Sequence, residues 1–396
     1  MCRVVKIIIF IFLSLAFYSC TEDSSIVVQP KEYSYTVPVQ KEDGWETASL
    51  TEVGMDVNKI VEMVNYIQNT PKRQIHNILI IKNKKLVFEE YFSSNTYSIS
   101  PPAIDSNIIS YNMNMLHYWA SVSKSVTSVL FGIAIDKGFI SSDVNEKIIT
   151  YLPNYSSILT GEKENITVKN LLTMTSGLDW DENTYPYGDS RNDVTRLFSF
   201  SDPIGFVLNK NLYASPGTVF HYNSGVTNVL AEIIRQKSKL NLLQFAEKYL
   251  FQPLGIKQYE WQKLRGEYYF ASGGLSLRPR DMAKIGFLFL NDGKWNGNQI
   301  LSQQWLDASK QSYINPQVGF ADGYGYQWWI GSAVVGEDII NYFFAAGLGE
   351  QYMFVIPSLD LIIIFNCGYF GVPVTISPFQ LIEDYIAPSL FPELVN

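Results

Sequence analysis

The sequence has 396 residues, of which 47% are hydrophobic and 17% charged, and its formal net charge is -8. This balance is typical of a globular protein with a large core and excludes an intrinsically disordered chain. The acidic excess provides no basic surface of the kind that nucleic-acid-binding proteins use, so we expect no nucleic acid partner. The length allows one large domain or two ordinary ones.

The first 19 residues are predicted to be a targeting signal. Arg3 and Lys6 precede an apolar run at residues 7–17, which is too short to span a bilayer as a helix. Ser19 and Cys20 follow, in an arrangement that resembles a bacterial lipoprotein signal peptide (residues 1–19) with Cys20 as the lipidated residue. The alternative is an ordinary secretory signal cut near Ser19, and either signal exports the protein.

The mature chain is therefore expected to begin with a lipid anchor. Residues 20–44 would be a lipidated, flexible tether that holds a domain of residues 45–396 to a bacterial cell-envelope membrane, on its periplasmic or outer-surface side. Only Cys20 and Cys367 would remain after cleavage, and acylation of Cys20 would leave no pair for a disulfide. Cys367 follows an apolar run and is expected to be a small buried side chain.

The next elements predict the start of a mixed α/β domain. Residues 57–70 have the apolar periodicity of a helix. Residues 77–81 and 86–91 are apolar runs on either side of Lys-Asn-Lys-Lys, which is a hairpin pattern. The polar residues 94–114, rich in Ser, Asn and Pro, are predicted to form a loop.

The segment Ser-Val-Ser-Lys at residues 121–124 opens a predicted helix at residues 125–138. A serine and a lysine three positions apart on a helix lie one turn from each other on the same face. The lysine amine can then accept the proton of the serine hydroxyl, and the helix N-terminus favours negative charge on Ser121. The spacing is that of Ser-Lys nucleophilic catalysis. The alternative is a polar helix start with a solvated lysine.

The C-terminal part completes the predicted fold. Helical patterns separated by turns occupy residues 144–240, one of them at residues 226–237, shortly after Tyr222. Strands are predicted at residues 341–345, 352–356 and 361–365. Residues 378–390 are predicted to form a closing helix. Strands at both ends with helices between them indicate one sheet built from the N- and C-terminal parts.

Five further motifs follow the Ser-Val-Ser-Lys segment along the chain. They are Gly-Ile-Ala-Ile-Asp-Lys-Gly at residues 132–138, Ile-Thr-Val-Lys-Asn-Leu-Leu-Thr-Met-Thr-Ser-Gly-Leu at 166–178, Pro-Gly-Thr-Val-Phe-His-Tyr-Asn-Ser at 216–224, Gly-Gly-Leu-Ser-Leu-Arg-Pro-Arg-Asp-Met-Ala at 273–283 and Phe-Ala-Ala-Gly-Leu-Gly-Glu-Gln at 344–351. In this order and spacing the chain resembles the serine β-lactamase and penicillin-binding protein family over residues 45–390. It is most similar to the class C-like branch, which includes esterases, D-amino-acid peptidases and 6-aminohexanoate-dimer hydrolases.

The resemblance implies an α/β fold of the α+β type, in which an antiparallel sheet is flanked by helices. A mostly helical insertion would occupy residues 141–260, with the site between the two parts. It also implies an acyl-enzyme on Ser121, with Lys124 as activator and Tyr222 as the group that passes protons to and from the serine and the leaving group. The backbone N–H groups of Ser121 and Leu348 would form the oxyanion hole.

The first departure from the family pattern follows the tyrosine. Class C β-lactamases have Tyr-x-Asn, whereas this chain has Tyr222-Asn223-Ser224. Ser224 can still hydrogen-bond a substrate or Lys124, although its reach is shorter. Asn223 is expected to point elsewhere.

The second departure lies on the strand that usually reads Lys-Thr-Gly, which here reads Ala345-Ala346-Gly347. With Gly349 these are the expected substrate-binding positions, and glycine lets a strand edge approach the substrate closely. Neither alanine offers a cation or a hydroxyl. Because the family lysine helps to hold a β-lactam carboxylate, its loss argues against efficient antibiotic hydrolysis and favours the esterase or amidase side of the family.

Other patterns indicate no additional chemistry. His76, His117 and His221 lack zinc-ligand spacing, and no Gly-x-Ser-x-Gly motif is present, so we expect neither a metal nor another cofactor. His221 is adjacent to Tyr222, but adjacent residues usually face apart. The aromatic residues 324–329 either line the cleft or pack in the core.

The sequence thus predicts an exported, membrane-anchored serine hydrolase that cleaves a small-molecule ester, amide or peptide. Within the same class, the alternative is a true class C-like β-lactamase or DD-peptidase. From another class, the alternative is a catalytically silent protein of the penicillin-binding fold that binds cell-wall fragments or a partner. The presence of Ser121, Lys124 and Tyr222 together argues against silence.

Overall fold

The centre of the fold is an antiparallel sheet of seven strands in the order β12-β13-β14-β15-β16-β1-β2. The computed structural model describes residues 32–99 and 102–391, and the residues from Ser34 onward form one structural unit. Cys20 lies outside the described residues. The strands are β1 (Ile75–Lys82), β2 (Lys85–Tyr91), β12 (Gly323–Tyr324), β13 (Trp329–Val335), β14 (Asp338–Gly347), β15 (Gln351–Ile356) and β16 (Leu361–Cys367).

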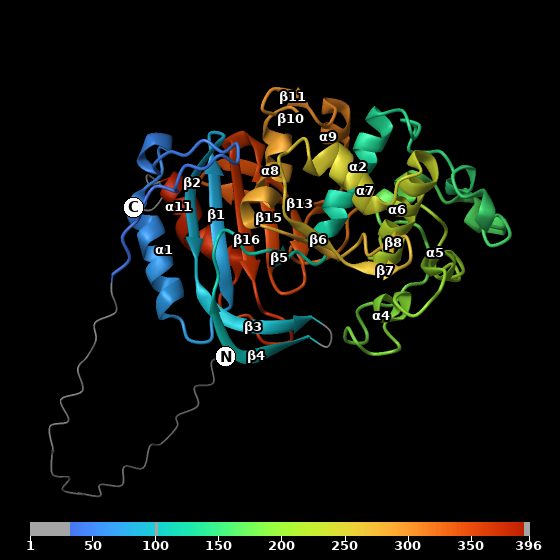
Figure 1. Ribbon diagram of the computed structural model, residues 1–396, viewed down its shortest axis with the longest axis horizontal. Coiled ribbons are helices and arrows are strands. Elements are labelled where there is room, and N and C mark those ends of the chain that lie inside the picture. Colours follow the sequence, from blue (N-terminus) through green and yellow to red (C-terminus); the bar gives the residue numbers. More distant parts are fainter. Residues whose placement is uncertain (1–31, 100–101, 392–396) are drawn as a thin grey trace, which may run out of the picture. The chain divides into compact units, whose positions relative to one another are not determined.

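The sheet joins the two ends of the domain, because β1 pairs directly with β16 (Figure 1). The predicted single sheet is therefore confirmed. All seven residues of β16 are buried, Cys367 among them. A strand covered on both faces needs apolar side chains at every position, which explains its unbroken Leu-Ile-Ile-Ile-Phe sequence.

Helices cover both faces of the sheet. A Cβ on Gly286 of α8 (Pro279–Leu290) would lie 2.9 Å from Met353, whereas the neighbouring Phe354 contacts Phe379 at the C-terminus. Because successive side chains of a strand point to opposite faces, α8 and the C-terminal segment lie on opposite sides. The C-terminal segment consists of α10 (Pro378–Leu381), a π-helical turn η7 (Ile382–Ile386) and α11 (Ala387–Leu390), and it packs against α1 (Val57–Asn69).

The region between β2 and β12 is mostly helical. Its longer helices are α2 (Val122–Asp136), α6 (Ser224–Ser238), α8 and α9 (Gln303–Ser309). Its shorter ones are η2 (Ile148–Thr150), η3 (Pro153–Tyr155), η4 (Gly161–Asn165), α3 (Val168–Leu172), α4 (Asp193–Leu197), α5 (Pro203–Leu208), α7 (Leu242–Ala246) and η5 (Glu247–Phe251). The remaining elements are η1 (Thr51–Val53), η6 (Pro357–Leu359), β5 (His117–Tyr118), β6 (Tyr259–Trp261), β7 (Lys263–Arg265), β8 (Tyr268–Tyr269), β9 (Leu275–Leu277), β10 (Lys294–Trp295) and β11 (Asn298–Gln299).

The predicted loop at residues 94–114 is wrong over most of its length. Strands β3 (Ser93–Ile99) and β4 (Pro102–Ser110) form an antiparallel hairpin there. Strand pairing uses backbone groups, so polar residues can form a ribbon whose side chains mostly face solvent. The hydroxyls of Ser93 and Ser110 face each other at 2.9 Å across the ladder.

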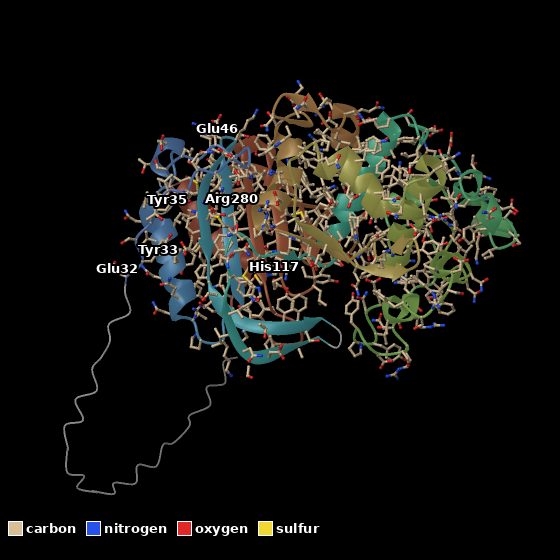
Figure 2. All side chains as sticks on the ribbon, viewed as in Figure 1. Glu32, Tyr33, Tyr35, Glu46, His117 and Arg280 are labelled. Atoms are coloured by element: carbon tan, nitrogen blue, oxygen red, sulfur yellow. The ribbon has the colours of Figure 1, made fainter. Side chains whose placement is uncertain are left out.

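The hairpin covers a buried histidine pair. His76 Nδ1 lies 2.7 Å from His117 Nε2, and Tyr97 and Tyr111 stack on the His76 ring. Figure 2 shows His117 inside the molecule, beside the hairpin. Burial lowers the pKa of His117 to about 4. Burial and the charge of His117 lower the pKa of His76 well below its usual value.

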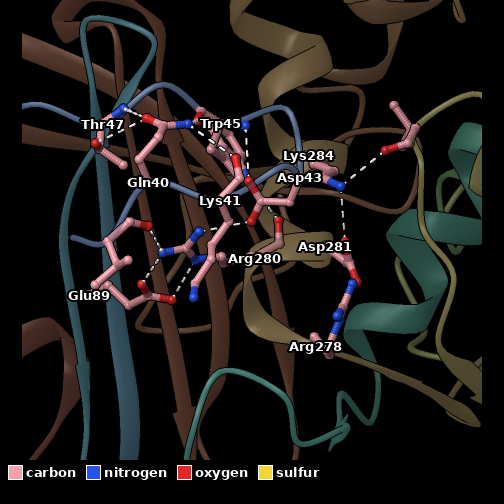
Figure 3. A network of polar contacts seen from close by, with 12 residues as sticks. Gln40, Lys41, Asp43, Trp45, Thr47, Glu89, Arg278, Arg280, Asp281 and Lys284 are labelled. Carbon is pink, nitrogen blue, oxygen red and sulfur yellow. Dashed lines mark hydrogen bonds and ion pairs between the residues drawn. The ribbon is translucent and has the colours of Figure 1, made fainter.

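A polar network fixes the N-terminal segment of the domain to α8 (Figure 3). Arg280 is buried and donates to Glu89 of β2 and to Asp43, each at 2.8 Å. Its carbonyl accepts a hydrogen bond from Trp45 Nε1. One turn further, Lys284 forms an ion pair with Asp281. Every buried cation of this network therefore has a carboxylate partner.

Candidate active site

Ser121 lies at the start of α2, directly after a strained residue. The helix begins at Val122, three residues earlier than predicted, and Ser121 is its N-cap residue. Ala120 has φ +46°, a conformation that residues other than glycine rarely adopt. Its carbonyl accepts hydrogen bonds from both the backbone N–H and the Oγ of Ser123, which hold it in place. Such strain at a turn is common beside catalytic groups and lifts the serine out of the regular helix.

Lys124 lies one turn along the same helix and is only 2% exposed. Its Nζ donates to Ser121 Oγ at 2.9 Å and to the carbonyl oxygen of Ser272 at 2.9 Å. Among the described residues no carboxylate forms an ion pair with it. The spacing read from the sequence therefore brings the hydroxyl and the amine into direct contact.

Tyr222 completes this group of side chains. Its ring centroid lies 4.8 Å from Lys124 Nζ. On another side it stacks on Trp329 at the start of β13, with ring centroids 5.8 Å apart. Tyr324 and Trp328 of the same aromatic run are buried. The run therefore both packs in the core and, through Trp329, supports the site.

The N-terminus of α6 is fixed by a buried carboxylate that the sequence analysis did not identify. Glu182 accepts hydrogen bonds from the backbone N–H of Ser224 at 2.7 Å and from its Oγ at 2.9 Å. Trp180 Nε1 donates to the same carboxylate at 2.6 Å. Ser224 therefore points to Glu182 and not to Lys124. Asn223 caps α6 by accepting from Val226 N–H.

The end of β14 lies against Ser121. A Cβ on Gly347 would be 2.5 Å from the carbonyl oxygen of Trp119 and 3.1 Å from Ser121 N, so only glycine fits. Leu348 follows directly and is 38% exposed. Gly349 has φ +80°, and a Cβ there would collide with the ring of Phe370. The predicted oxyanion residues Ser121 and Leu348 are thus brought together by a close backbone approach.

The two alanines of this strand face different ways. Ala345 lies on the same face of β14 as Gly347, because side chains alternate, and Ala346 lies on the other. Ala345 is fully packed and is opposite Met353. The position that carries a lysine in the family pattern is therefore occupied here by a small buried methyl group.

A pocket of about 260 Å³ opens beside Ser121. It is lined by Tyr118, Ala120, Ser121, Tyr187, Gly188, Val194, Thr195, Phe198, Ser224, Gln262, Phe270, Gly273 and Leu348. None of these side chains is a carboxylate, ammonium or guanidinium group. Burial raises the pKa of Tyr118, and burial together with the charge of Glu182 raises that of Tyr187, so both phenols are neutral.

Gln327 was also missed, because a single glutamine in an aromatic run gives no signal of its role. Its side chain accepts from Thr227 Oγ1 of α6 at 2.7 Å and donates to the carbonyl oxygen of Leu171 of α3. Its own carbonyl accepts from Ser125 Oγ of α2. One residue thus connects three helices behind the site. Glu182 could have been suspected only from its place just after the Thr-Ser-Gly-Leu motif.

The histidines lie apart from the catalytic group. His221 Nε2 lies 2.7 Å from the carbonyl oxygen of Trp180, while His76 and His117 form the pair described above. Within residues 32–99 and 102–391 no cluster of three or more His, Cys, Asp or Glu side chains could hold a metal ion. The same part of the chain has no helix that is both long and apolar enough to cross a bilayer.

Comparison with known proteins places this geometry in a family. The model of the family described as Beta-lactamase matches residues 65–368. A 6-aminohexanoate-dimer hydrolase of Paenarthrobacter ureafaciens is 26% identical over 280 residues, which are 63% of this chain and 65% of that protein. The chain thus spans just under two thirds of the length of that relative.

Solved structures show the same fold. A family VIII carboxylesterase superposes with a TM-score of 0.64 at 14% identity, covering 83% of this chain and 96% of that one. An octameric penicillin-binding protein homologue from Pyrococcus abyssi gives 0.59 at 19% identity, covering 86% and 77%. The predicted antiparallel sheet flanked by helices is confirmed by these matches. The chain belongs to the beta-lactamase family and has the fold of these solved structures.

Proposed function

We propose that the protein is an exported enzyme that cleaves a small ester or amide through an acyl-enzyme on Ser121. The observation that carries this proposal is the 2.9 Å contact between Lys124 Nζ and Ser121 Oγ. The amine is buried, and its other acceptor is a neutral carbonyl, that of Ser272. An adjacent carboxylate would hold the proton on the amine, and no described carboxylate does so. Lys124 is therefore suited to take the serine proton.

The steps follow from the positions of the groups. Ser121 Oγ attacks the substrate carbonyl as its proton passes to Lys124, and the N–H groups of Ser121 and Leu348 stabilise the oxyanion. Tyr222, beside Lys124, delivers a proton to the departing alcohol or amine, so the C–O or C–N bond breaks and the acyl group remains on Ser121. Water then attacks the acyl carbon and gives a proton to these groups, the bond between the acyl carbon and Ser121 Oγ breaks, and that proton passes to Ser121 Oγ as the acid leaves.

Neutral esters and amides are the substrates that this site favours. Ala345 supplies no cation for a β-lactam carboxylate, and the pocket lining carries no charged side chain. The names of the relatives, a carboxylesterase and a 6-aminohexanoate-dimer hydrolase, support the same two bond types. We expect a short activated ester to be the most convenient test substrate.

A serine-directed fluorophosphonate probe tests the mechanism. It should label the native protein once, at Ser121, and peptide mapping by mass spectrometry should locate the label. Ser121→Ala should abolish both labelling and ester turnover, while Ser224→Ala, whose hydroxyl is engaged by Glu182, should still be labelled. Labelling that survives in Ser121→Ala would refute the proposed nucleophile.

The export signal supports a membrane-anchored location. We infer that Cys20 is acylated after removal of residues 1–19 and that residues 20–44 connect the anchor to the hydrolase domain at residues 45–396, on the periplasmic or outer-surface side. Metabolic labelling with an alkyne fatty acid in a bacterial host should mark the native chain but not Cys20→Ser. Equal fatty-acid incorporation in the two chains would contradict lipidation at this cysteine.

A further inference from the structure

The pocket beside Ser121 has an apolar wall contributed by the helical region. Val194 belongs to α4, and Phe198 caps the C-terminal end of that helix. The Phe198 ring meets the ring of Phe270 edge to face, with centroids 5.0 Å apart. Val194 and Phe198 lie more than 70 residues along the chain from both Ser121 and Phe270, so the wall is a product of the tertiary fold.

The members of the lining indicate which part of a substrate the pocket receives. Both proposed oxyanion residues, Ser121 and Leu348, line it, whereas Tyr222 and Lys124 do not. In the proposed reaction the leaving group must reach Tyr222 to be protonated. The part of the substrate that enters the pocket is therefore the part that stays on the serine.

We propose that this pocket binds the acyl group of a neutral substrate and that Phe198 limits the length of that group. The inference rests on the proposed acyl-enzyme and adds to it a substrate class. It assigns α4, at the edge of the helical region, a direct part in specificity.

Charge supports a neutral acyl group. Arg196 of α4 and Lys210, which follows α5, already form ion pairs with Asp193, at 3.1 Å and 2.6 Å. A carboxylate at the end of an acyl chain would lose its water in the pocket and meet only neutral side chains, none of which carries a compensating positive charge. Burying a charge without a partner is costly, so such substrates should be rejected.

The volume sets the size range. A cavity of about 150 Å³ is enough to bind benzene, and pockets for drug-sized ligands have about 300–1,000 Å³. At about 260 Å³ this pocket lies between them. It should therefore accept an acyl group of roughly four to eight carbons, somewhat larger than benzene, and disfavour long fatty acyl chains.

The length limit can be tested with 4-nitrophenyl esters from acetate to dodecanoate, which share one leaving group. Native protein should show a maximum of kcat/KM at a short or medium chain. Phe198→Ala should shift the maximum to longer chains and raise the decanoate-to-butyrate ratio roughly tenfold or more, since added methylenes in an apolar pocket change rates by about 10–200-fold. Phe198→Trp should shift it the other way.

The chain offers a matched control in Phe200. This residue is 38% exposed, stacks on Phe206 and does not line the pocket. Phe200→Ala should leave the decanoate-to-butyrate ratio unchanged. If Phe198→Ala changes the ratio no more than Phe200→Ala does, the assigned role of Phe198 is wrong.

A second series separates the acyl side from the leaving-group side. Acetate esters of alcohols of increasing length should respond equally in native protein and Phe198→Ala. If Phe198→Ala instead changes selectivity among the alcohols, the pocket holds the leaving group and the proposal is overturned. Absence of both ester turnover and Ser121 labelling would refute the proposed function itself, and this inference with it.

The charge requirement is tested on native protein, so it does not depend on the folding of any variant. The 4-nitrophenyl ester of hexanoate should be hydrolysed at least roughly tenfold faster than the half-ester of adipate, which ends in a carboxylate at a similar length. Equal rates for the two esters would overturn the neutral-acyl assignment.

Discussion

Two buried lysines in this molecule have nearly the same burial and opposite surroundings. Lys284 of α8 is 0% exposed and Lys124 of α2 is 2% exposed. Lys284 forms an ion pair with Asp281 at 3.0 Å and donates to the carbonyl oxygen of Leu254. Lys124 also donates to a carbonyl oxygen, that of Ser272, but its other partner is the hydroxyl of Ser121.

The two lysines differ in one partner: Lys124 has a hydroxyl where Lys284 has a carboxylate. An ion-paired lysine is a fixed cation that holds two segments of the fold together. A lysine whose partners are a carbonyl and a hydroxyl can change its protonation without leaving a buried carboxylate uncompensated. Burial alone therefore does not distinguish the ion-paired Lys284 from Lys124, the proposed catalytic lysine, whereas their partners do.

The largest effect is expected at Lys124 and Tyr222. Lys124→Met and Tyr222→Phe should each reduce turnover of 4-nitrophenyl butyrate by roughly 10²–10⁴-fold, because each removes a proton-transfer group. Their effects should not add in the double variant, since both act on one proton pathway. Thermal unfolding should show that the fold persists. Near-native turnover in Tyr222→Phe would assign proton transfer to another residue.

Lys284→Met should give the opposite result. Removing one partner of a buried ion pair costs up to about 3–5 kcal/mol, and the loss here should lie below that range because Arg278 still pairs with Asp281 at 2.7 Å. Denaturant unfolding should report this loss, while kcat per folded molecule stays close to native. If Lys284→Met loses turnover but not stability, Lys284 does not have the purely structural role proposed for it.

The buried histidine pair predicts how the stability of the protein depends on pH. An unfolded histidine binds its proton near pH 6.5, whereas burial lowers the pKa of His117 to about 4. The unfolded state therefore binds more protons between these values, and stability should fall as the pH decreases from 6.5 to 4. The loss from His117 is about 3 kcal/mol, and His76 adds to it in the same direction.

Denaturant unfolding at several pH values measures this slope. The double variant His76→Gln/His117→Gln should have a shallower slope than native protein. His221→Gln, which changes a histidine outside the pair, should leave the slope as it is. A native stability that is constant from pH 7 to pH 4 would contradict the neutral pair.

The smallest effect concerns a cation that the site lacks. A charge-assisted hydrogen bond contributes about 1.5–3 kcal/mol, so a β-lactam carboxylate should bind roughly ten- to a hundredfold more weakly here than beside a strand lysine. Neutral esters carry no such penalty. The kcat/KM for the best ester should therefore exceed that for a chromogenic cephalosporin. If the cephalosporin is hydrolysed equally well, the β-lactamase alternative replaces the esterase or amidase assignment.

Much of the fold could be predicted because the pattern of apolar residues in the sequence indicates the buried strands. The continuous apolar run of β16 and the paired runs of β1 and β2 indicated a sheet made from both ends of the chain. The β3–β4 hairpin was not predictable, since its side chains are polar and its pairing depends on backbone groups that every sequence shares.

Residue spacing alone predicts the site only where its geometry is local, whereas Tyr222 and Leu348 were named through the family resemblance. Ser121 and Lys124 are one helical turn apart, so their spacing implies their contact. Glu182 meets Ser224 from 42 positions away, and Gln327 meets Thr227 from 100 positions away. No spacing rule covers such distances, and a buried polar partner has no sequence pattern of its own.

The pairing of β1 with β16 also governs when the protein can fold. Residues 75–82 can pair with residues 361–367 only after these have been synthesised, so the complete sheet cannot form until almost the whole chain has left the ribosome. Contacts so distant in sequence make folding slow and expose apolar strand edges in the meantime. Under the proposed export, this delay would let the chain cross the membrane before its sheet forms. A chain truncated before residue 361 should accumulate as insoluble material, since β1 would keep β2 on one side but expose its other edge, where β16 belongs.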